Sequence, residues 1–194
     1  TAGQSQVKSV IPLIELKGVP LNDAVKTLAR QSNFNFILDP KLSDFYRAAD
    51  GKVASQPTVT NRWENTSAEE ALTQLLKEHG LKMVKSPVSS VTRITYTNQP
   101  VTKVDGDPFG NDTNAIPRIQ MDSMPLANAL TTIAGQAKKN VIIDPKISQT
   151  NNEVSFRWEN ITAKQALIAL CENFNLVMTK DSSTGVIHIK ADEK

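Results

Sequence analysis

The sequence predicts an α+β protein made of two tandem copies of one module, and an internal repeat is the first observation behind this prediction. Residues 11–43 and 116–148 align without a gap at an offset of 105, with fifteen of their thirty-three positions identical. A second pair of blocks, 62–85 and 157–180, aligns at an offset of 95. Within each copy, strand and helix periodicities alternate, which is the second observation. Two amphipathic helices need a sheet to cover, so we expect two β-α-β-β-α-β-β modules, each with two helices packed on small mixed sheets.

The repeat also predicts the domain boundaries. A first module is expected over residues 1–97, with an insert at 44–57, because the offset between the copies falls by ten across that stretch. Residues 98–115 are rich in Asn, Asp, Gly, Pro and Thr, a composition typical of a linker. The second module is expected over 116–194. Modules of under about 100 residues bury a modest fraction of their surface but can fold alone.

The first module is expected to begin with a strand, a helix and a second strand. Residues 13–16 form the first strand, and residues 18–20 interrupt it with a glycine and a proline. Apolar residues then recur at three- and four-residue spacing over 21–31, the pattern of an amphipathic helix whose first turn tolerates proline. Alternating apolar residues over 34–38 predict the second strand, which an Asp-Pro pair ends.

A further strand, a second helix and a hairpin are expected to complete the first module. The strand covers residues 59–64. Ser67 and Glu70 have the spacing of a capping box at the start of the helix, which ends near Gly80. Two strands within 81–96 then pair as a hairpin.

The second module is expected to repeat this order. Thr162 and Gln165 supply the same capping chemistry with different residues, which indicates a structural reason for that position. The elements are expected as strands over 118–121, 140–143, 154–158, 176–179 and 186–190, and as helices over 126–137 and 163–173.

Composition and motif content exclude several classes of function. A formal net charge of +2 does not favour nucleic acid or an anionic membrane as a partner, and no apolar run approaches the roughly 18 residues of a transmembrane helix. No G-x-S-x-G, H-E-x-x-H, C-x-x-C or P-loop motif is present. We therefore expect no enzyme, no catalytic, metal or cofactor site, no nucleic-acid partner and no direct membrane insertion. Cys171, on the apolar stripe of a helix, is expected to be a core thiol.

Both copies share a pattern of core and turn residues. In the first copy its members are Pro20-Leu21, Ala24, Leu28-Ala29, Asn35, Asp39-Pro40, Asn65, Ala71-Leu72 and Leu75-Leu76-Leu81. In the second copy they are Pro125-Leu126, Ala129-Leu130, Ala134, Asn140, Asp144-Pro145, Asn160, Ala166-Leu167 and Leu170-Leu176. The pattern resembles the short N-terminal domain shared by secretins and TonB-dependent transporters, and the resemblance covers everything except the tail, the insert and the linker.

The resemblance implies a function as well as a fold. In that family the domain is a periplasmic protein-interaction module, which docks inner-membrane platform components in secretins and anti-sigma regulators in signalling transporters. By this resemblance we expect a non-catalytic interaction module of the bacterial cell envelope, exported with its signal peptide removed, with an envelope protein as partner and with oligomerisation possible. The alternative is a periplasmic receptor domain for glycan or peptidoglycan fragments, with Phe45 and Tyr46 of the insert as a stacking platform.

An Arg-Trp-Glu-Asn tetrapeptide, present in each copy, supplies the other candidate partner-binding residues. They are Arg62 and Trp63 in the first copy and Arg157 and Trp158 in the second. One interpretation makes the tryptophans exposed anchors, because Trp and Arg are enriched at binding hot spots. The other places each tryptophan on the inward face of a strand, with the charged neighbours in solvent. Strand alternation of Val154, Phe156 and Trp158 favours the inward placement.

Overall fold

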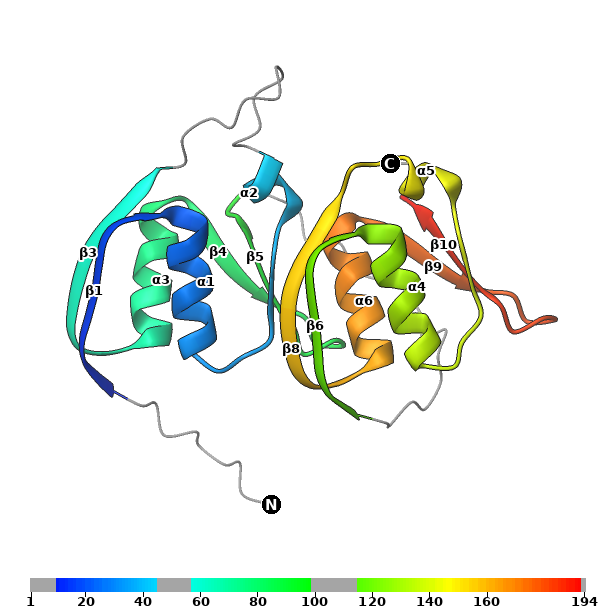
Figure 1. The fold of residues 1–194 in the computed structure, drawn as a ribbon, viewed down its shortest axis with the longest axis horizontal. Coiled ribbons are helices and arrows are strands. Elements are labelled where there is room, and N and C mark those ends of the chain that lie inside the picture. Colours follow the sequence, from blue (N-terminus) through cyan, green and yellow to red (C-terminus); the bar gives the residue numbers. More distant parts are fainter. Residues whose placement is uncertain (1–9, 45–56, 99–114, 193–194) are drawn as a thin grey trace. The chain divides into compact units, whose positions relative to one another are not determined.

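The computed structural model describes residues 10–44, 57–98 and 115–192, and the chain forms two compact units. Unit 1 comprises Thr1–Phe34 and Lys41–Met83, and unit 2 comprises Asn35–Pro40 and Val84–Lys194. The units therefore divide the chain elsewhere than the sequence repeat does. The elements mix helices with small sheets (Figure 1), which confirms the predicted α+β class.

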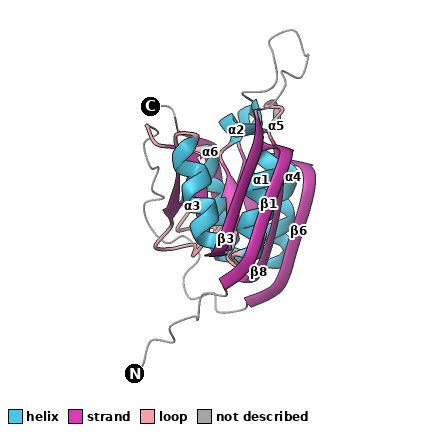
Figure 2. Cartoon of the chain, turned by 90° about the vertical axis from the view of Figure 1, so that its left-hand side faces the viewer, coloured by secondary structure: helices cyan, strands magenta, loops and turns pink. Residues whose placement is uncertain are grey.

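Unit 1 contains a two-stranded antiparallel sheet with two helices packed on it. The strands β1 and β3 pair along almost their whole length (Figure 2). The two helices pack against each other and against this sheet, which buries their apolar stripes. The bounds are β1 (Val10–Pro20), α1 (Leu21–Gln31), β3 (Thr58–Ser67) and α3 (Ala68–Glu78). The next strand, β4 (Leu81–Lys85), belongs to unit 1 up to Met83 and to unit 2 from Val84.

Unit 2 contains the matching elements of the second copy and two strands of the first. The sheets have the strand orders β6-β8 and β7-β10-β9, and β2 pairs in parallel with β5 in the sheet β2-β5-β4. Helices α4 and α6 contact strands of both second-copy sheets and so lie between them. The bounds are β2 (Phe36–Leu38), β5 (Thr92–Tyr96), β6 (Ala115–Pro125), α4 (Leu126–Gln136), β7 (Val141–Ile143), α5 (Pro145–Ser148), β8 (Glu153–Thr162), α6 (Ala163–Phe174), β9 (Leu176–Lys180) and β10 (Ile187–Ala191).

The expected break in the first strand is wrong, because a bulge takes its place. β1 continues to Pro20, and the register with β3 shifts between Leu16 and Val19. Gly18 sits inside this shift at φ +60°, and its N–H donates to Thr60 Oγ1 at 3.0 Å. In a β-bulge the extra residue is accommodated without ending the strand. Ser123 adopts the same left-handed conformation at the corresponding shift in β6.

Both predicted capping boxes are present. Ser67 Oγ accepts from the Glu70 N–H at 3.3 Å, and the Ser67 N–H donates to Glu70 Oε2 at 3.1 Å. Thr162 and Gln165 exchange the same two bonds at 3.1 and 3.0 Å. These bonds satisfy amide groups that a helix start leaves without intrahelical partners, which explains why α3 and α6 begin where they do.

Two short helices occur at positions where the sequence predicts no helix. α2 (Pro40–Asp44) begins directly after Asp39, and α5 begins after Asp144, whose Oδ1 accepts from the Lys146 N–H at 2.8 Å. In both copies the Asp-Pro pair therefore opens a helical turn rather than only ending a strand, consistent with the preference for proline in the first turn. Most of the insert at 44–57 and of the linker at 98–115 lies outside the described residues.

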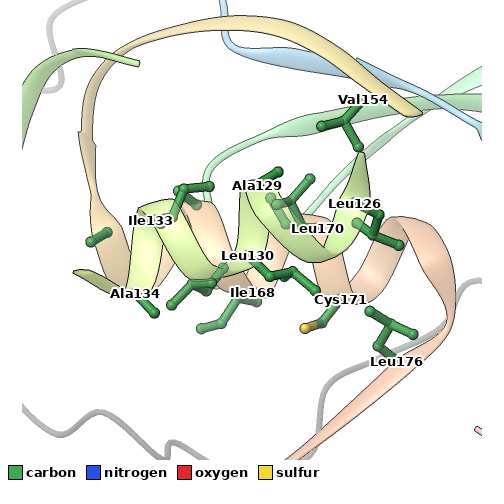
Figure 3. Close-up of a cluster of buried hydrophobic side chains, with 14 of the residues drawn as sticks. Leu126, Ala129, Leu130, Ile133, Ala134, Val154, Ile168, Leu170, Cys171 and Leu176 are labelled. Atoms are coloured by element: carbon green, nitrogen blue, oxygen red, sulfur yellow. The ribbon is translucent and has the colours of Figure 1, made fainter. Parts of the chain in front are cut away.

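The main core of unit 2 is a single cluster around α4 and α6 (Figure 3). The apolar residues of both helices meet there, and β8 contributes the predicted inward face of Val154, Phe156 and Trp158. Cys171 is fully buried in the same cluster, which confirms its predicted core position. Burial raises the pKa of its thiol, so it is poorly suited to act as a nucleophile. The cluster also includes Ile37 from β2, so the core of unit 2 takes in part of the first copy.

Candidate functional site

In unit 2, strand β2 and its neighbour β5 cover a surface made by α6 and β8. β2 packs against both of these elements, and the Ile37 side chain, only 4% exposed, joins their core. Ile168 and Ala169 of α6 are buried as well. This contact is a filled docking surface: one face of a sheet from the first copy lies on a helix and a strand from the second.

The composition of α6 reflects this cover. At the offset of 95, Ile168 and Ala169 correspond to Thr73 and Gln74 of α3, which are exposed and polar. The buried side of each helix keeps the same Ala-Leu pattern, so only the additional covered side differs. An amphipathic helix carries apolar residues wherever a neighbour excludes water, which accounts for the second apolar side of α6.

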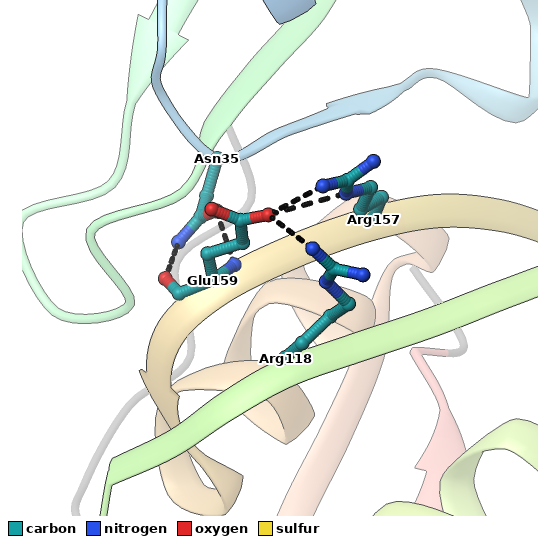
Figure 4. Close-up of polar contacts among 4 residues, drawn as sticks. All are labelled: Asn35, Arg118, Arg157 and Glu159. Atoms are coloured by element: carbon teal, nitrogen blue, oxygen red, sulfur yellow. Dashed lines mark hydrogen bonds and ion pairs between the residues drawn. The ribbon is translucent and has the colours of Figure 1, made fainter.

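The Asn35 side chain forms a two-bond contact with the main chain of β8 (Figure 4). Its Nδ2 donates to the Glu159 carbonyl oxygen at 2.8 Å, and its Oδ1 accepts from the Glu159 N–H at 2.8 Å. A side-chain amide has the same donor and acceptor groups as a peptide unit. Asn35 therefore satisfies both main-chain groups of Glu159 as a neighbouring strand would.

Two side chains of the docking surface bond to the main chain of β2. The indole Nε1 of Trp158 donates to the Phe36 carbonyl oxygen at 2.7 Å. The Nδ2 of Asn173, near the end of α6, donates to the Leu38 carbonyl oxygen at 3.0 Å. Together with the bonds of Asn35, these bonds fix β2 along its length, because they are spread over residues 35 to 38.

Arg93 of β5 joins the end of α6 to a buried carboxylate. Its Nη2 lies 2.7 Å from Asp39 Oδ2, and its Nη1 donates to the Glu172 carbonyl oxygen at 3.1 Å. Thr95 Oγ1 donates to the same Asp39 oxygen at 2.6 Å. The positive charge of Arg93 lies near the C-terminal end of α6, where the helix dipole favours a cation.

The Glu172 carboxyl group is a half-buried acidic group in this contact. Burial raises its pKa above the ordinary value, against the opposing effects of hydrogen bonds from Ser86 and Ser89 and of the charge of Arg93. Ser86 Oγ lies 3.1 Å from Oε1, and Ser89 Oγ lies 3.5 Å from Oε2. The charged form is thus disfavoured relative to the unfolded chain.

We expect replacement of Glu172 by glutamine to change the pH dependence of stability. Because the folded pKa is raised, the contribution of Glu172 is fully present below the unfolded value of about 4.5 and is lost as pH rises through the folded pKa. E172Q should therefore gain stability relative to the parent chain as pH rises from about 4 to about 8. Urea midpoints measured across that range test this, and a constant difference between the two proteins would contradict it.

The sheet β7-β10-β9 of the second copy repeats the docking face of β2 and β5, but this face is open. Ile142 corresponds to Ile37, and its side chain is 53% exposed. Ile142 is opposite His188 in the same register as Ile37 opposite Arg93. Asn140, the counterpart of Asn35, is exposed. Val177 of β9 is a further exposed apolar residue, at 41%.

We define this candidate site, the open sheet face, as Asn140, Ile142, Val177 and His188. Ile142 and Val177 point away from the core, because their strand neighbours Val141, Ile143, Leu176 and Met178 pack against it. Sequence reasoning missed this site. Its signal is that identical residues, Asn and Ile, recur at equivalent positions in two copies whose neighbouring helices differ in composition.

The predicted partner-binding tryptophans lie inside the protein. Trp158 is completely buried and stacks on Phe156 with ring centroids 3.8 Å apart. Trp63 is buried in unit 1, where its Nε1 donates to Gln74 Oε1 at 2.8 Å. The interpretation of the two tryptophans as exposed anchors is therefore wrong, and their predicted inward placement is confirmed. Their strands turn the bulky apolar side chain toward the helices by the alternation of β-structure.

The predicted arginines lie on the outer surface. Arg157 Nη2 contacts Glu159 Oε1 at 2.8 Å, and Arg118 Nη2 is 3.5 Å from the same oxygen (Figure 4). A hydrogen bond and the charge of Arg157 hold the pKa of Glu159 below its ordinary value. Arg62 and Glu64 form the equivalent exposed pair in unit 1 at 2.8 Å. Partner binding by Arg62 and Arg157 stays a prediction.

Phe45 and Tyr46, the candidate stacking platform, lie outside the described residues. Within the described ranges, no group of three or more His, Cys, Asp or Glu side chains could hold a metal ion. In the same part of the chain, no helix is both long and apolar enough to cross a membrane. Comparisons with family models, with curated proteins and with solved structures gave no match to this chain.

Proposed function

We propose that this chain is a non-catalytic protein-interaction module of the bacterial cell envelope and that it binds a protein through the open sheet face. One observation carries the proposal. The equivalent face of β2 and β5 is a protein-docking surface in unit 2, where Ile37 is buried, whereas Ile142 is exposed. Exposed apolar residues grouped with polar ones are typical of interaction sites.

The envelope location and the class of partner rest on the resemblance to secretin and TonB-receptor N-terminal domains. A secretion or signalling assembly, with an inner-membrane platform protein or a regulator as partner, fits that resemblance. The open sheet face is the surface at which we place this contact. A partner can bind to both the main-chain groups and the alternate side chains of a small sheet.

We expect replacement of Ile142 by aspartate to abolish specific capture of a partner from a periplasmic extract. A charge at the centre of an apolar contact has to be desolvated on binding, which weakens association strongly. The measurement is affinity capture with the intact chain and with I142D as baits, followed by identification of proteins present only with the intact chain.

The matched control is L13D, because Leu13 is also an exposed apolar residue of a strand, but it belongs to β1 of unit 1 and is not one of the residues of the open sheet face. L13D should capture the same protein as the parent chain. Equal capture by all three baits would contradict binding through this face. Retention of the chain on a peptidoglycan column, with no protein captured, would instead favour a glycan receptor.

A further inference from the structure

We propose that the partner at the open sheet face is another domain of this same fold, which presents a helix and strand of the kind formed by α6 and β8. This inference rests on the proposed function and names the partner of the same site. Its basis is that unit 2 already contains the corresponding complex within one chain. In this complex, β2 packs on a helix with an additional apolar side and on a strand with an inward tryptophan.

The open sheet face retains the groups that make this contact in unit 2. Asn140 can pair with both main-chain groups of a strand, as Asn35 does with Glu159. Ile142 can fill the space against an apolar helix side, as Ile37 does. His188 takes the place of Arg93, and an imidazole N–H can donate to a carbonyl at a helix end.

The main chain of β7 offers the remaining two acceptors. In the filled contact, the carbonyl oxygens of Phe36 and Leu38 accept from Trp158 and Asn173. Their counterparts in β7 are the carbonyl groups of Val141 and Ile143. Since carbonyl groups do not depend on residue type, these acceptors are retained although the side chains differ. A partner helix is thus expected to carry a donor such as asparagine near its C-terminal end.

A second copy of this chain does not supply the required surface through α3. In α3, Gln74 stands at the position of Ala169, and its side chain accepts a hydrogen bond from the indole N–H of Trp63 at 2.8 Å. The equivalent indole N–H of Trp158 in β8 donates instead to the docked strand β2. The Trp63 donor is therefore already used within unit 1. Thr73 replaces Ile168 and leaves this side of α3 polar and exposed. The helix that would fit, α6, already packs against β2, and Arg93 of β5 donates to a carbonyl near its end. The partner therefore has to be a different domain with an α6-like helix.

The inference can be tested by converting α3 of this chain into such a helix. The probe carries T73I, Q74A, K77E and E78N, which place the α6 residues on α3, together with I142D, which blocks its own open sheet face. The strand β3 needs no change, because Arg62, Trp63 and Glu64 match the corresponding residues of β8. The parent chain offers only the sheet face and the probe offers only the helix face.

We expect the parent chain and the probe to form a one-to-one complex, measured by sedimentation velocity and by titration calorimetry. Each protein alone should remain a monomer. I142D without the helix changes should bind the probe at least about tenfold more weakly than the parent chain does, as for a central interface residue. A shorter probe with only T73I, Q74A and I142D serves if circular dichroism shows that the full set unfolds α3.

Two results would overturn the inference. A folded probe that gives no complex with the parent chain would show that the open sheet face does not accept an α6-like helix. Self-association of the parent chain that T73D abolishes would show that the partner is a second copy bound through α3. If an envelope protein is captured through Ile142 but the probe forms no complex, the proposed function is retained. Only the inference that the partner presents an α6-like helix is then rejected.

Discussion

Replacement of Trp158 by alanine is expected to destabilise unit 2 by about 3–5 kcal/mol, the usual cost of truncating a buried aromatic residue. The side chain is fully buried, stacks on Phe156 and donates its indole N–H to the Phe36 carbonyl oxygen. Its loss opens a cavity between β8 and the helices and removes a bond to β2. Urea denaturation followed by circular dichroism measures the effect.

A matched pair of phenylalanine variants separates the stability lost with the hydrogen bond of Trp158 from the stability lost with its side-chain volume. W158F and W63F remove the same atoms, but the acceptors differ: Phe36 is buried, whereas Gln74 is exposed and can bond to water instead. Losing a buried hydrogen bond costs about 1–3 kcal/mol, so W158F should be the more destabilising variant. In each variant the remaining tryptophan reports by fluorescence on the other unit. Equal losses would contradict a special role for the bond to β2.

The positions of the helices could be predicted from sequence because local chemistry determines them. α1 spans Leu21–Gln31, as the apolar spacing predicts, and α3 and α6 begin at the two capping boxes. The predicted strand interruption at Gly18 is wrong. A residue in the left-handed conformation is compatible with either the end of a strand or a β-bulge, and Gly18 adopts this conformation within the strand. Pairing with β3 along both sides of Gly18 decides for the bulge, and that pairing is a tertiary fact.

The candidate site was less accessible to prediction, although part of its signal is in the sequence. The alternation in β8 predicts the burial of Trp158, so the inward alternative could be favoured beforehand. Nothing local distinguishes Ile37 from Ile142, since both follow the same Asn-x-Ile pattern, yet one is buried and the other exposed. The difference comes from which helix a strand meets. The apolar residues Ile168 and Ala169 on a second side of α6 indicate that this helix has an additional neighbour. The indication is visible only when they are compared with the polar residues at the same positions of α3.

Replacement of Arg93 by alanine is expected to cost unit 2 about 3–5 kcal/mol, because it removes the counter-ion of a buried carboxylate. The Arg93 and Asp39 side chains are only 11% and 3% exposed, and the ion pair between them is 2.7 Å long. The same change removes the donor to the Glu172 carbonyl at the end of α6. Urea denaturation of unit 2 measures the loss, and H188A serves as the matched control, since His188 is the counterpart on the open sheet face.

A double-mutant cycle shows how much of this cost arises because the buried Asp39 carboxylate loses its counter-ion. R93M combined with D39N removes both charges and keeps similar side-chain volumes, so the double variant should lose much less stability than the sum of the two single variants. In D39N, Thr95 can still donate to the side-chain oxygen at this position, because an amide keeps one acceptor oxygen. Additive losses, or a cost for R93A as small as the roughly 0.5 kcal/mol expected of H188A, would show that the contacts of Arg93 with Asp39 and with the end of α6 do not hold β5 in place. The covered face of β2 and β5 would then depend on Ile37, Asn35, Trp158 and Asn173 rather than on Arg93. In that case the substitution of histidine for arginine on the open sheet face would carry no penalty for docking.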